Sequence, residues 1–296
     1  TAYEISACLV GSEMCIRDRQ YHFLKRPYEL IPLAAGQMPT RTYYDQSGEV
    51  LADDVDPSLV AYTDYVVTIR DDIRYQPHQA LAKDQENNYV YHDLSLDDLE
   101  SVHVLSDLPL QGTRQLTAYD YVYQIKRLAH PNLHSPLAGL LANYIVGFGD
   151  YRDQVLTAME QTPGQWLDLT NIAMEGVVAL DDLRYSIRVQ GVYPQFIYWL
   201  SMPFFAPIPW EADKFYSQVG MKERNLSFDW YPIGTGPYML TENNPNLRMV
   251  LEKNPNFHGE RYPSEGEAED RAAGLLDDAG KALPFVDKVV FSLEKE

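Results

Sequence analysis

Neighbouring pairs of acidic residues are the first feature of this sequence that could do chemistry. Two carboxyl groups that face each other across a sugar, about 5 to 9.5 Å apart, can cleave a glycosidic bond. Neighbours in sequence point to opposite faces of a strand and diverge on a helix, so adjacency does not predict such a pair. We therefore expect turn and helix-cap roles for most of these acids: Asp53-Asp54, Asp71-Asp72, Asp97-Asp98, Asp181-Asp182 and Asp277-Asp278.

Two histidines, His130 and His134, have the i, i+4 spacing of a metal pair on one helix face. Pro131 lies between them where a helix should end, and no Glu completes the HExxH pattern, so we expect helix termination instead. The segment Gly234-Thr235-Gly236-Pro237 lacks the third glycine of a dinucleotide loop. The sequence thus predicts no metal, no cofactor and no catalytic residue.

The elements that would position a site alternate between helices and strands. Period-2 patterns predict strands at residues 64–70, 184–189, 246–253 and 289–293. Helical spacing predicts helices at 118–129, from 135 onward, at 152–161, 194–202 and 209–219, the first capped by Thr117 and Asp120. Residues 76–88 are expected to form a loop, and the acidic residues 264–282 a loop or weak helix. This mixture predicts an α/β or α+β fold with antiparallel pairs.

The charge balance limits the possible partners. The 296 residues carry 43 acidic and 24 basic side chains, for a net charge of -19, which argues against nucleic acid. No run approaches the roughly 18 apolar residues that cross a bilayer. The 22 tyrosines suit both core packing and ligand pockets, because each joins an apolar ring to a polar hydroxyl.

The first 19 residues differ from the rest of the chain. They lack the basic start, apolar middle and cleavage site of a signal peptide, and they resemble a translated sequencing-library adapter. We expect residues 1–19 to be a disordered artefact. Both cysteines, Cys8 and Cys15, lie within it, so the remaining chain would have no disulfide and no cysteine nucleophile.

Four segments together carry a family resemblance. The run from Leu116 to Tyr123, followed by Lys126-Arg127-Leu128, resembles the LTA-x-D helix start of family 5 extracellular solute-binding proteins. Gly234-Thr235-Gly236-Pro237-Tyr238 resembles that family's GTGPY segment, and Lys253 to Phe257 its NP-x-aromatic turn. Tyr65 to Tyr75 resembles the strand before its dGxplTA region. The chain departs from the pattern at residues 109–114 and in an insertion-like segment at 262–283.

The resemblance implies a type II periplasmic-binding-protein-like α/β fold. Residues 20–45 and 184–296 would form the first lobe, and residues 46–183 a small α/β domain inserted into it. The second lobe, which closes over the ligand in this family, would be missing from the chain.

The resemblance also implies a function and a set of ligand contacts. The chain would be a periplasmic or cell-envelope protein, a monomer that delivers a small peptide to an ABC transporter permease without catalysis. Alternatives are a binding protein for a non-peptide solute, a carboxylate-dependent hydrolase, or a protein-interaction module on the same fold. The expected cleft residues are Trp230, Tyr231, Thr235, Gly236, Tyr238, Phe204 and Phe205. For Tyr238 and the two phenylalanines, a place in the core is an equal alternative.

Overall fold

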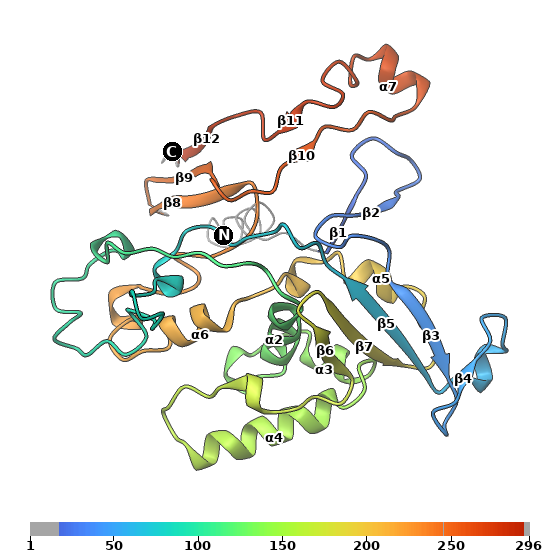
Figure 1. The fold of residues 1–296 in the computed structure, drawn as a ribbon, viewed down its shortest axis with the longest axis horizontal. Coiled ribbons are helices and arrows are strands. Elements are labelled where there is room, and N and C mark those ends of the chain that lie inside the picture. The colour runs from blue at the N-terminus through green and yellow to red at the C-terminus, as the bar shows by residue number, and fades with distance from the viewer. Residues whose placement is uncertain (1–17, 245, 293–296) are drawn as a thin grey trace. The chain divides into compact units, whose positions relative to one another are not determined.

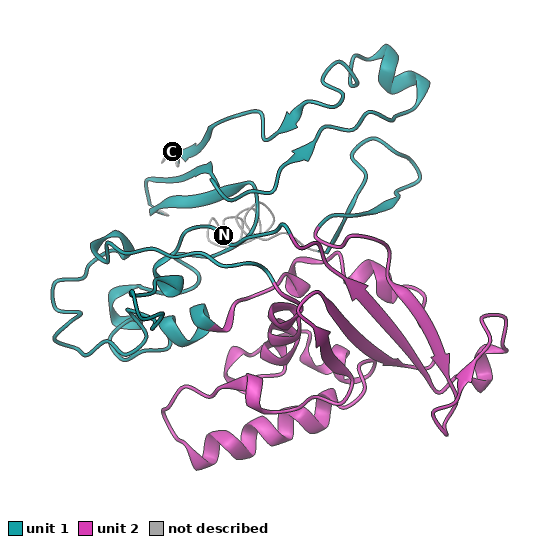
Figure 2. Ribbon diagram, in the orientation of Figure 1, with its two compact units in different colours: residues 1–33, 72–116, 211–296 teal, residues 34–71, 117–210 magenta. Residues whose placement is uncertain are grey.

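The computed structural model describes residues 18–244 and 246–292, and these form two compact units. Unit 1 comprises residues 1–33, 72–116 and 211–296, and unit 2 comprises residues 34–71 and 117–210 (Figure 2). Both units are therefore assembled from segments far apart in the sequence. The assignment of lobes and of an inserted domain made from the sequence stays a prediction.

Unit 2 is built on a five-stranded antiparallel sheet of order β4-β3-β5-β7-β6. The strands are β3 Thr40–Tyr44, β4 Val50–Leu51, β5 Tyr62–Thr68, β6 Val177–Asp181 and β7 Arg184–Gln190. Buried and less buried residues alternate along β5 and β7, because one face of the sheet covers the core. Tyr65, Val67, Tyr185, Ile187 and Val189 supply this buried face.

The helices of unit 2 follow the expected local signals. They are α2 Ala118–Leu128, α3 Ala138–Ala142, α4 Phe148–Gln161 and α5 Phe196–Trp199. Helix α2 packs on β6 and β7 (Figure 1). The N–H of Thr117 donates to the Asp120 carboxylate at 2.9 Å, so the predicted cap is confirmed. Helix α4 begins four residues before the predicted start, after Gly147, whose φ of 71° suits glycine.

The described residues of unit 1 form three small antiparallel sheets. One pairs β1 Arg19–Tyr21 with β2 Leu30–Pro32, and another pairs β10 Glu260–Arg261 with β11 Ala282–Leu283. The third has the order β12-β9-β8, with β8 Tyr238–Asn244, β9 Arg248–Lys253 and β12 Lys288–Ser292. Helices α6 Trp210–Tyr216 and α7 Ala268–Ala272 are short.

Single 3-10 turns connect these elements in both units. They lie at Pro57–Leu59, Gln79–Leu81, Leu105–Asp107, Pro131–Leu133, Leu169–Asn171, Pro203–Phe205 and Lys222–Arg224.

The mixed α/β architecture with antiparallel pairs agrees with the sequence analysis. Each predicted strand and helix has a counterpart, although the helix expected at 194–202 contracts to four residues. Cys8 and Cys15 lie outside the described residues. Asp18 and Arg19 are described and buried, and Arg19 opens β1 opposite Pro32. Within the described ranges, no helix has the length and apolarity needed to span a bilayer.

Candidate ligand-binding site

The loop at residues 232–236 is fixed by Gln76, which comes from a distant part of unit 1. The side-chain amide of Gln76 donates to the Pro232 carbonyl at 3.2 Å and accepts from the Gly234 N–H at 3.2 Å. The main-chain N–H of Gln76 donates to the Gly234 carbonyl at 2.9 Å. Gln76 is buried, so these hydrogen bonds replace the water that the loop would otherwise need.

The turn that follows β9 is tied to the same loop. The side-chain amide of Asn254 donates to the Gly236 carbonyl at 2.9 Å. The main-chain N–H of Asn254 donates to the Pro237 carbonyl, also at 2.9 Å. Asn256 donates from its side chain to the Tyr75 carbonyl at 2.8 Å. Two of the segments that carry the family resemblance are thus joined directly.

His78 and Tyr216 form a hydrogen-bonded chain that ends on Tyr231. The Nδ1 atom of His78 accepts from the Ala80 N–H at 3.0 Å, so the ring proton of the neutral histidine is on Nε2. Nε2 lies 2.9 Å from the Tyr216 hydroxyl, which donates to the Tyr231 carbonyl at 2.5 Å. Burial lowers the pKa of His78 to about 4, so the ring is neutral at pH 7.

This buried histidine makes stability depend on pH. Because the folded pKa lies below the ordinary value near 6.5, the unfolded chain binds the proton first, and stability falls as the pH drops from 6.5 towards 4. We expect a loss of about 1 kcal/mol between pH 7.5 and pH 5.5, measured by urea unfolding. His78→Asn, which retains an acceptor for the Ala80 N–H, should show a clearly smaller loss across this interval.

His103 supplies the control for this pH experiment, since its side chain is exposed. His103→Gln should leave the pH-dependent loss close to that of the unmodified chain. If the unmodified chain and His78→Asn lose equal stability between pH 7.5 and pH 5.5, protonation of His78 is not the cause of the loss. Burial also lowers the pKa of His92, so some loss should remain in every variant.

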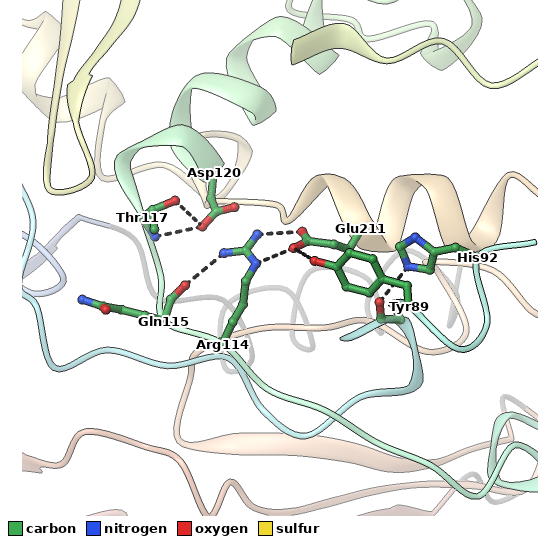
Figure 3. Close-up of polar contacts among 8 residues, drawn as sticks. Tyr89, His92, Arg114, Gln115, Thr117, Asp120 and Glu211 are labelled. Carbon is green, nitrogen blue, oxygen red and sulfur yellow. Dashed lines mark hydrogen bonds and ion pairs between the residues drawn. The ribbon is translucent and has the colours of Figure 1, made fainter. Parts of the chain in front are cut away.

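An ion pair between the buried Glu211 and the partly exposed Arg114 joins the segment before α2 to helix α6 within unit 1. Arg114 donates from Nε and Nη2 to the two carboxylate oxygens of Glu211, at 2.6 and 2.7 Å (Figure 3). The Tyr89 hydroxyl donates to the same carboxylate at 2.8 Å. Burial raises the pKa of Glu211, but the Arg114 guanidinium outweighs burial and holds that pKa below its usual range. Glu211 is therefore an ionised structural group.

A groove of about 660 Å³ lies beside the hydrogen-bonded residues Gln76, His78 and Pro232, entirely within unit 1. Its polar lining is dominated by neutral amides and hydroxyls, and its apolar lining includes Tyr231. A volume of this size is typical of small-molecule sites. The lining residues are Gln76, Pro77, His78, Gln79, Val104, Leu105, Ser106, Gln111, Tyr231, Pro232, the six residues 239–244, and Pro255.

The predicted cleft residues of unit 1 divide between the groove and the core. Tyr231 lines the groove, and the neighbouring Trp230 is partly buried. Thr235 and Gly236 are buried in the loop that Gln76 and Asn254 hold. Their ligand contacts stay predictions.

Tyr238 lies in the hydrophobic cluster of the β12-β9-β8 sheet, with Leu240, Met249 and Leu251. Its hydroxyl donates to the Val286 carbonyl at 2.9 Å. This placement corresponds to the core alternative raised by the sequence.

Phe204 and Phe205 belong to unit 2, whereas the groove belongs to unit 1. Phe205 is buried and contacts Phe196, with ring centroids 6.2 Å apart. Phe204 is partly exposed, and its carbonyl accepts from the Gln124 side chain at 2.8 Å. Both residues thus have packing roles in unit 2, and their contact with a ligand stays a prediction.

Several groove residues were missed by the sequence analysis. The segments 76–79 and 104–111 were assigned to loops or left unassigned, because they follow neither helical nor strand spacing. Only the polar, amide-rich composition of 76–88 hinted at a surface with hydrogen-bonding groups.

The acidic doublets take local structural roles where their partners are described. Asp98 accepts from the hydroxyl and N–H of Ser95, at 2.6 and 2.9 Å, which lowers the pKa of Asp98. Asp181 pairs with Arg184 at 2.7 Å, which lowers the pKa of Asp181. The turn and cap roles expected from the sequence are confirmed for Asp98 and Asp181. Among the described residues, no group of three or more His, Cys, Asp or Glu side chains could hold a metal ion.

Comparison with known sequences shows what the chain is similar to. It is 29% identical over 143 residues to the periplasmic oligopeptide-binding protein OppA of Salmonella typhimurium, covering 48% of this chain and 23% of that protein. It is 24% identical over 160 residues to the probable deoxycholate-binding periplasmic protein YgiS of Escherichia coli, covering 54% and 26%. The matched region thus spans about a quarter of the length of these relatives.

Solved structures with the same fold include two peptide-binding proteins. The structure of a periplasmic oligopeptide-binding protein from Borrelia burgdorferi has a TM-score of 0.54 at 15% identity, covering 98% of this chain and 39% of that one. The structure of the pheromone receptor PrgZ has a TM-score of 0.50 at 15% identity, covering 99% and 39%. These likenesses concern the fold alone, and they confirm the periplasmic-binding-protein-like class.

The match to a family model agrees with the resemblance seen in the sequence. Residues 111–294 match the model described as bacterial extracellular solute-binding proteins, family 5 Middle. This region contains the start of α2, the Gly234–Tyr238 loop and the Asn254 turn. Since it covers well over half of the chain, the protein belongs to the family 5 extracellular solute-binding proteins.

Proposed function

We propose that this chain captures a short peptide outside the cytoplasm, in the periplasm, and delivers it to the permease of an ABC importer. The observation that carries the proposal is the family match over residues 111–294. The name of the Salmonella relative, a periplasmic oligopeptide-binding protein, supports both the ligand class and the compartment. We further propose that the chain acts as a monomer and catalyses no reaction.

The groove in unit 1 supports a capture role by its chemistry. Its lining mixes amides and hydroxyls with apolar side chains such as Leu105 and Tyr231. Neutral hydrogen-bonding groups suit the peptide bond, which has one donor and one acceptor. The nearby carboxylate of Glu242 is paired with Arg248 at 2.8 Å, so it has a structural partner.

A second candidate ligand is an amphipathic non-peptide solute. The observation in its favour is the relative named as a probable deoxycholate-binding periplasmic protein. The apolar side chains of the groove would contact the rings of such a molecule.

A thermal-shift screen of the chain distinguishes the two ligand classes. Ligand at about 100 times its Kd stabilises the folded state by about 2.7 kcal/mol, which corresponds to a rise in Tm of about 5 °C or more. We expect this rise with some members of a set of di- to pentapeptides. A flat response to all peptides, together with a clear rise for deoxycholate, would contradict the peptide assignment.

A further inference from the structure

Few charged side chains line the groove of unit 1. Glu242 is the only Asp, Glu, Lys or Arg among the described residues that line it. Such residues make up 23% of the chain, so the groove differs in charge from the rest of the molecule. Its other polar side chains are amides and hydroxyls, such as those of Gln111 and Ser106, together with the imidazole of His78.

The carboxylates at the groove are engaged within the protein. Arg248 donates from Nε to one oxygen of Glu242 at 2.8 Å, and its Nη2 lies 2.8 Å from the other oxygen. This bidentate pair lowers the pKa of Glu242 and balances its charge. Asp107, which follows the lining segment 104–106, accepts from the main-chain N–H groups of His103 and Val104 at 2.8 and 3.0 Å. Neither carboxylate is therefore left to neutralise a cationic ligand.

The histidine that lines the groove is held in its uncharged form by geometry. The Nδ1 atom of His78 accepts from the Ala80 N–H at 3.0 Å, and Nε2 lies 2.9 Å from the Tyr216 hydroxyl. A second ring proton would sit on Nδ1 and point at the Ala80 N–H, so protonation would break this contact. The imidazole therefore supplies no positive charge that could neutralise an anionic ligand at pH 7.

A lining of this kind penalises an ionised group of either sign. Amides and hydroxyls can hydrogen-bond a peptide bond, but they do not offset the loss of water around a full charge. A groove of about 660 Å³ encloses most of a small-molecule ligand. A tripeptide spans only about 10 Å. Both ends and the central side chain of such a peptide would therefore come close to the uncharged lining.

We propose that the groove of unit 1 selects uncharged peptides, which have neutral side chains and ends that are blocked or joined by an amide bond. This inference rests on the proposed peptide-binding function and adds the substrate class. The net charge of -19 would by itself attract cationic peptides and repel anionic ones. Discrimination against both signs of charge therefore distinguishes the local lining from the long-range field of the protein.

The test uses the full 296-residue chain and acetylated, amidated tripeptides that have alanine at both ends and differ only at the central residue. Glutamine and glutamate form one matched pair, and norleucine and lysine form the other, since each pair has a similar shape. In isothermal titration calorimetry at pH 7.5, we expect the glutamate and lysine peptides to bind about tenfold more weakly than their neutral partners. Removal of both blocking groups from the glutamine peptide should weaken its binding by a similar factor.

A pair of variants tests the protein side of the same selection. Gln111→Glu places a carboxylate in the groove wall at an exposed position without a change of shape. It should tighten binding of the lysine peptide about threefold and weaken binding of the glutamate peptide by a similar factor. Gln85→Glu is the matched control, because Gln85 is exposed in unit 1 and is not among the described lining residues. Gln85→Glu should leave both affinities close to those of the unmodified chain.

The outcomes separate this inference from the proposed function. If charged and neutral peptides bind equally, or if the lysine peptide binds more tightly than the norleucine peptide, the charge selection is wrong while peptide capture stands. The same conclusion follows if blocking the ends weakens binding, because the protein then recognises charged ends. If Gln85→Glu shifts the affinities as much as Gln111→Glu, net charge and not the groove sets them, and the inference is wrong. If no peptide binds, blocked or free, both proposals are wrong.

Discussion

Replacing Arg114 by Met is expected to lower the free energy of unfolding by about 3–5 kcal/mol. Glu211 is only 2% exposed, and both of its carboxylate oxygens accept hydrogen bonds from Arg114. Without the guanidinium, the carboxylate would stay buried with the hydrogen bond from the Tyr89 hydroxyl, and it would lose the opposite charge that offsets its desolvation. Equilibrium unfolding in urea at pH 7.5 measures the change.

The control for Arg114 is another ion pair of unit 1, between Arg248 and Glu242, whose side chains are 53% and 37% exposed. Arg248→Met should cost far less, because solvent already screens that pair. The double variant Arg114→Met with Glu211→Leu should recover much of the lost stability, since it removes the orphaned charge. Equal losses in Arg114→Met and Arg248→Met would contradict the role of Arg114 in neutralising the buried Glu211 carboxylate.

Gly112→Ala is expected to destabilise unit 1 by about 3 kcal/mol or more. A Cβ at this position would lie 1.9 Å from the Leu81 carbonyl oxygen and 2.5 Å from its carbon. Both are main-chain atoms, so no side-chain rotation relieves the clash. Gly112 also exchanges two main-chain hydrogen bonds with His78, at 2.9 and 3.0 Å, and these would be displaced. Urea unfolding measures the loss.

Because Gln79, Gln111 and His78 line the groove, Gly112→Ala should also reduce ligand binding. Gly149→Ala is the matched control: Gly149 lies in helix α4, and an added Cβ meets no atom within 4 Å. In a helix this change should be neutral or stabilise by up to about 1 kcal/mol. A Gly112→Ala variant as stable as the unmodified chain would contradict the close approach of these two segments.

The sequence predicted best where a local pattern determines the element. Helix α2 has its Thr117 and Asp120 cap and its helical spacing, and β7 has clean alternation from Arg184 onward. The helix cap and the strand alternation both depend on residues that are near in sequence, so they can be recognised without knowledge of the fold. The segments around Gly234 and Asn254 were both recognised as resembling segments of the same family. The hydrogen bond that joins them could be seen only in the structure.

The groove could not be predicted because much of its wall comes from segments without periodic patterns. Gln76 and Gln111 lie in irregular stretches, and long-range contacts bring them to β8. Tyr238 was difficult to place for a different reason. An aromatic residue beside a glycine-containing loop is equally compatible with a ligand cleft and with the hydrophobic core. Its burial against Leu240 and Leu251 follows from the β8–β9 pairing.

Native mass spectrometry of the 296-residue chain tests the central claim, peptide capture without turnover, most directly. The chain would be incubated with a pool of tri- to pentapeptides of distinct mass, and with deoxycholate in a parallel sample. The account predicts complexes of one peptide per chain, with every peptide in the pool still intact after prolonged incubation. Absence of any peptide complex, or shortening of the peptides into fragments, would contradict it.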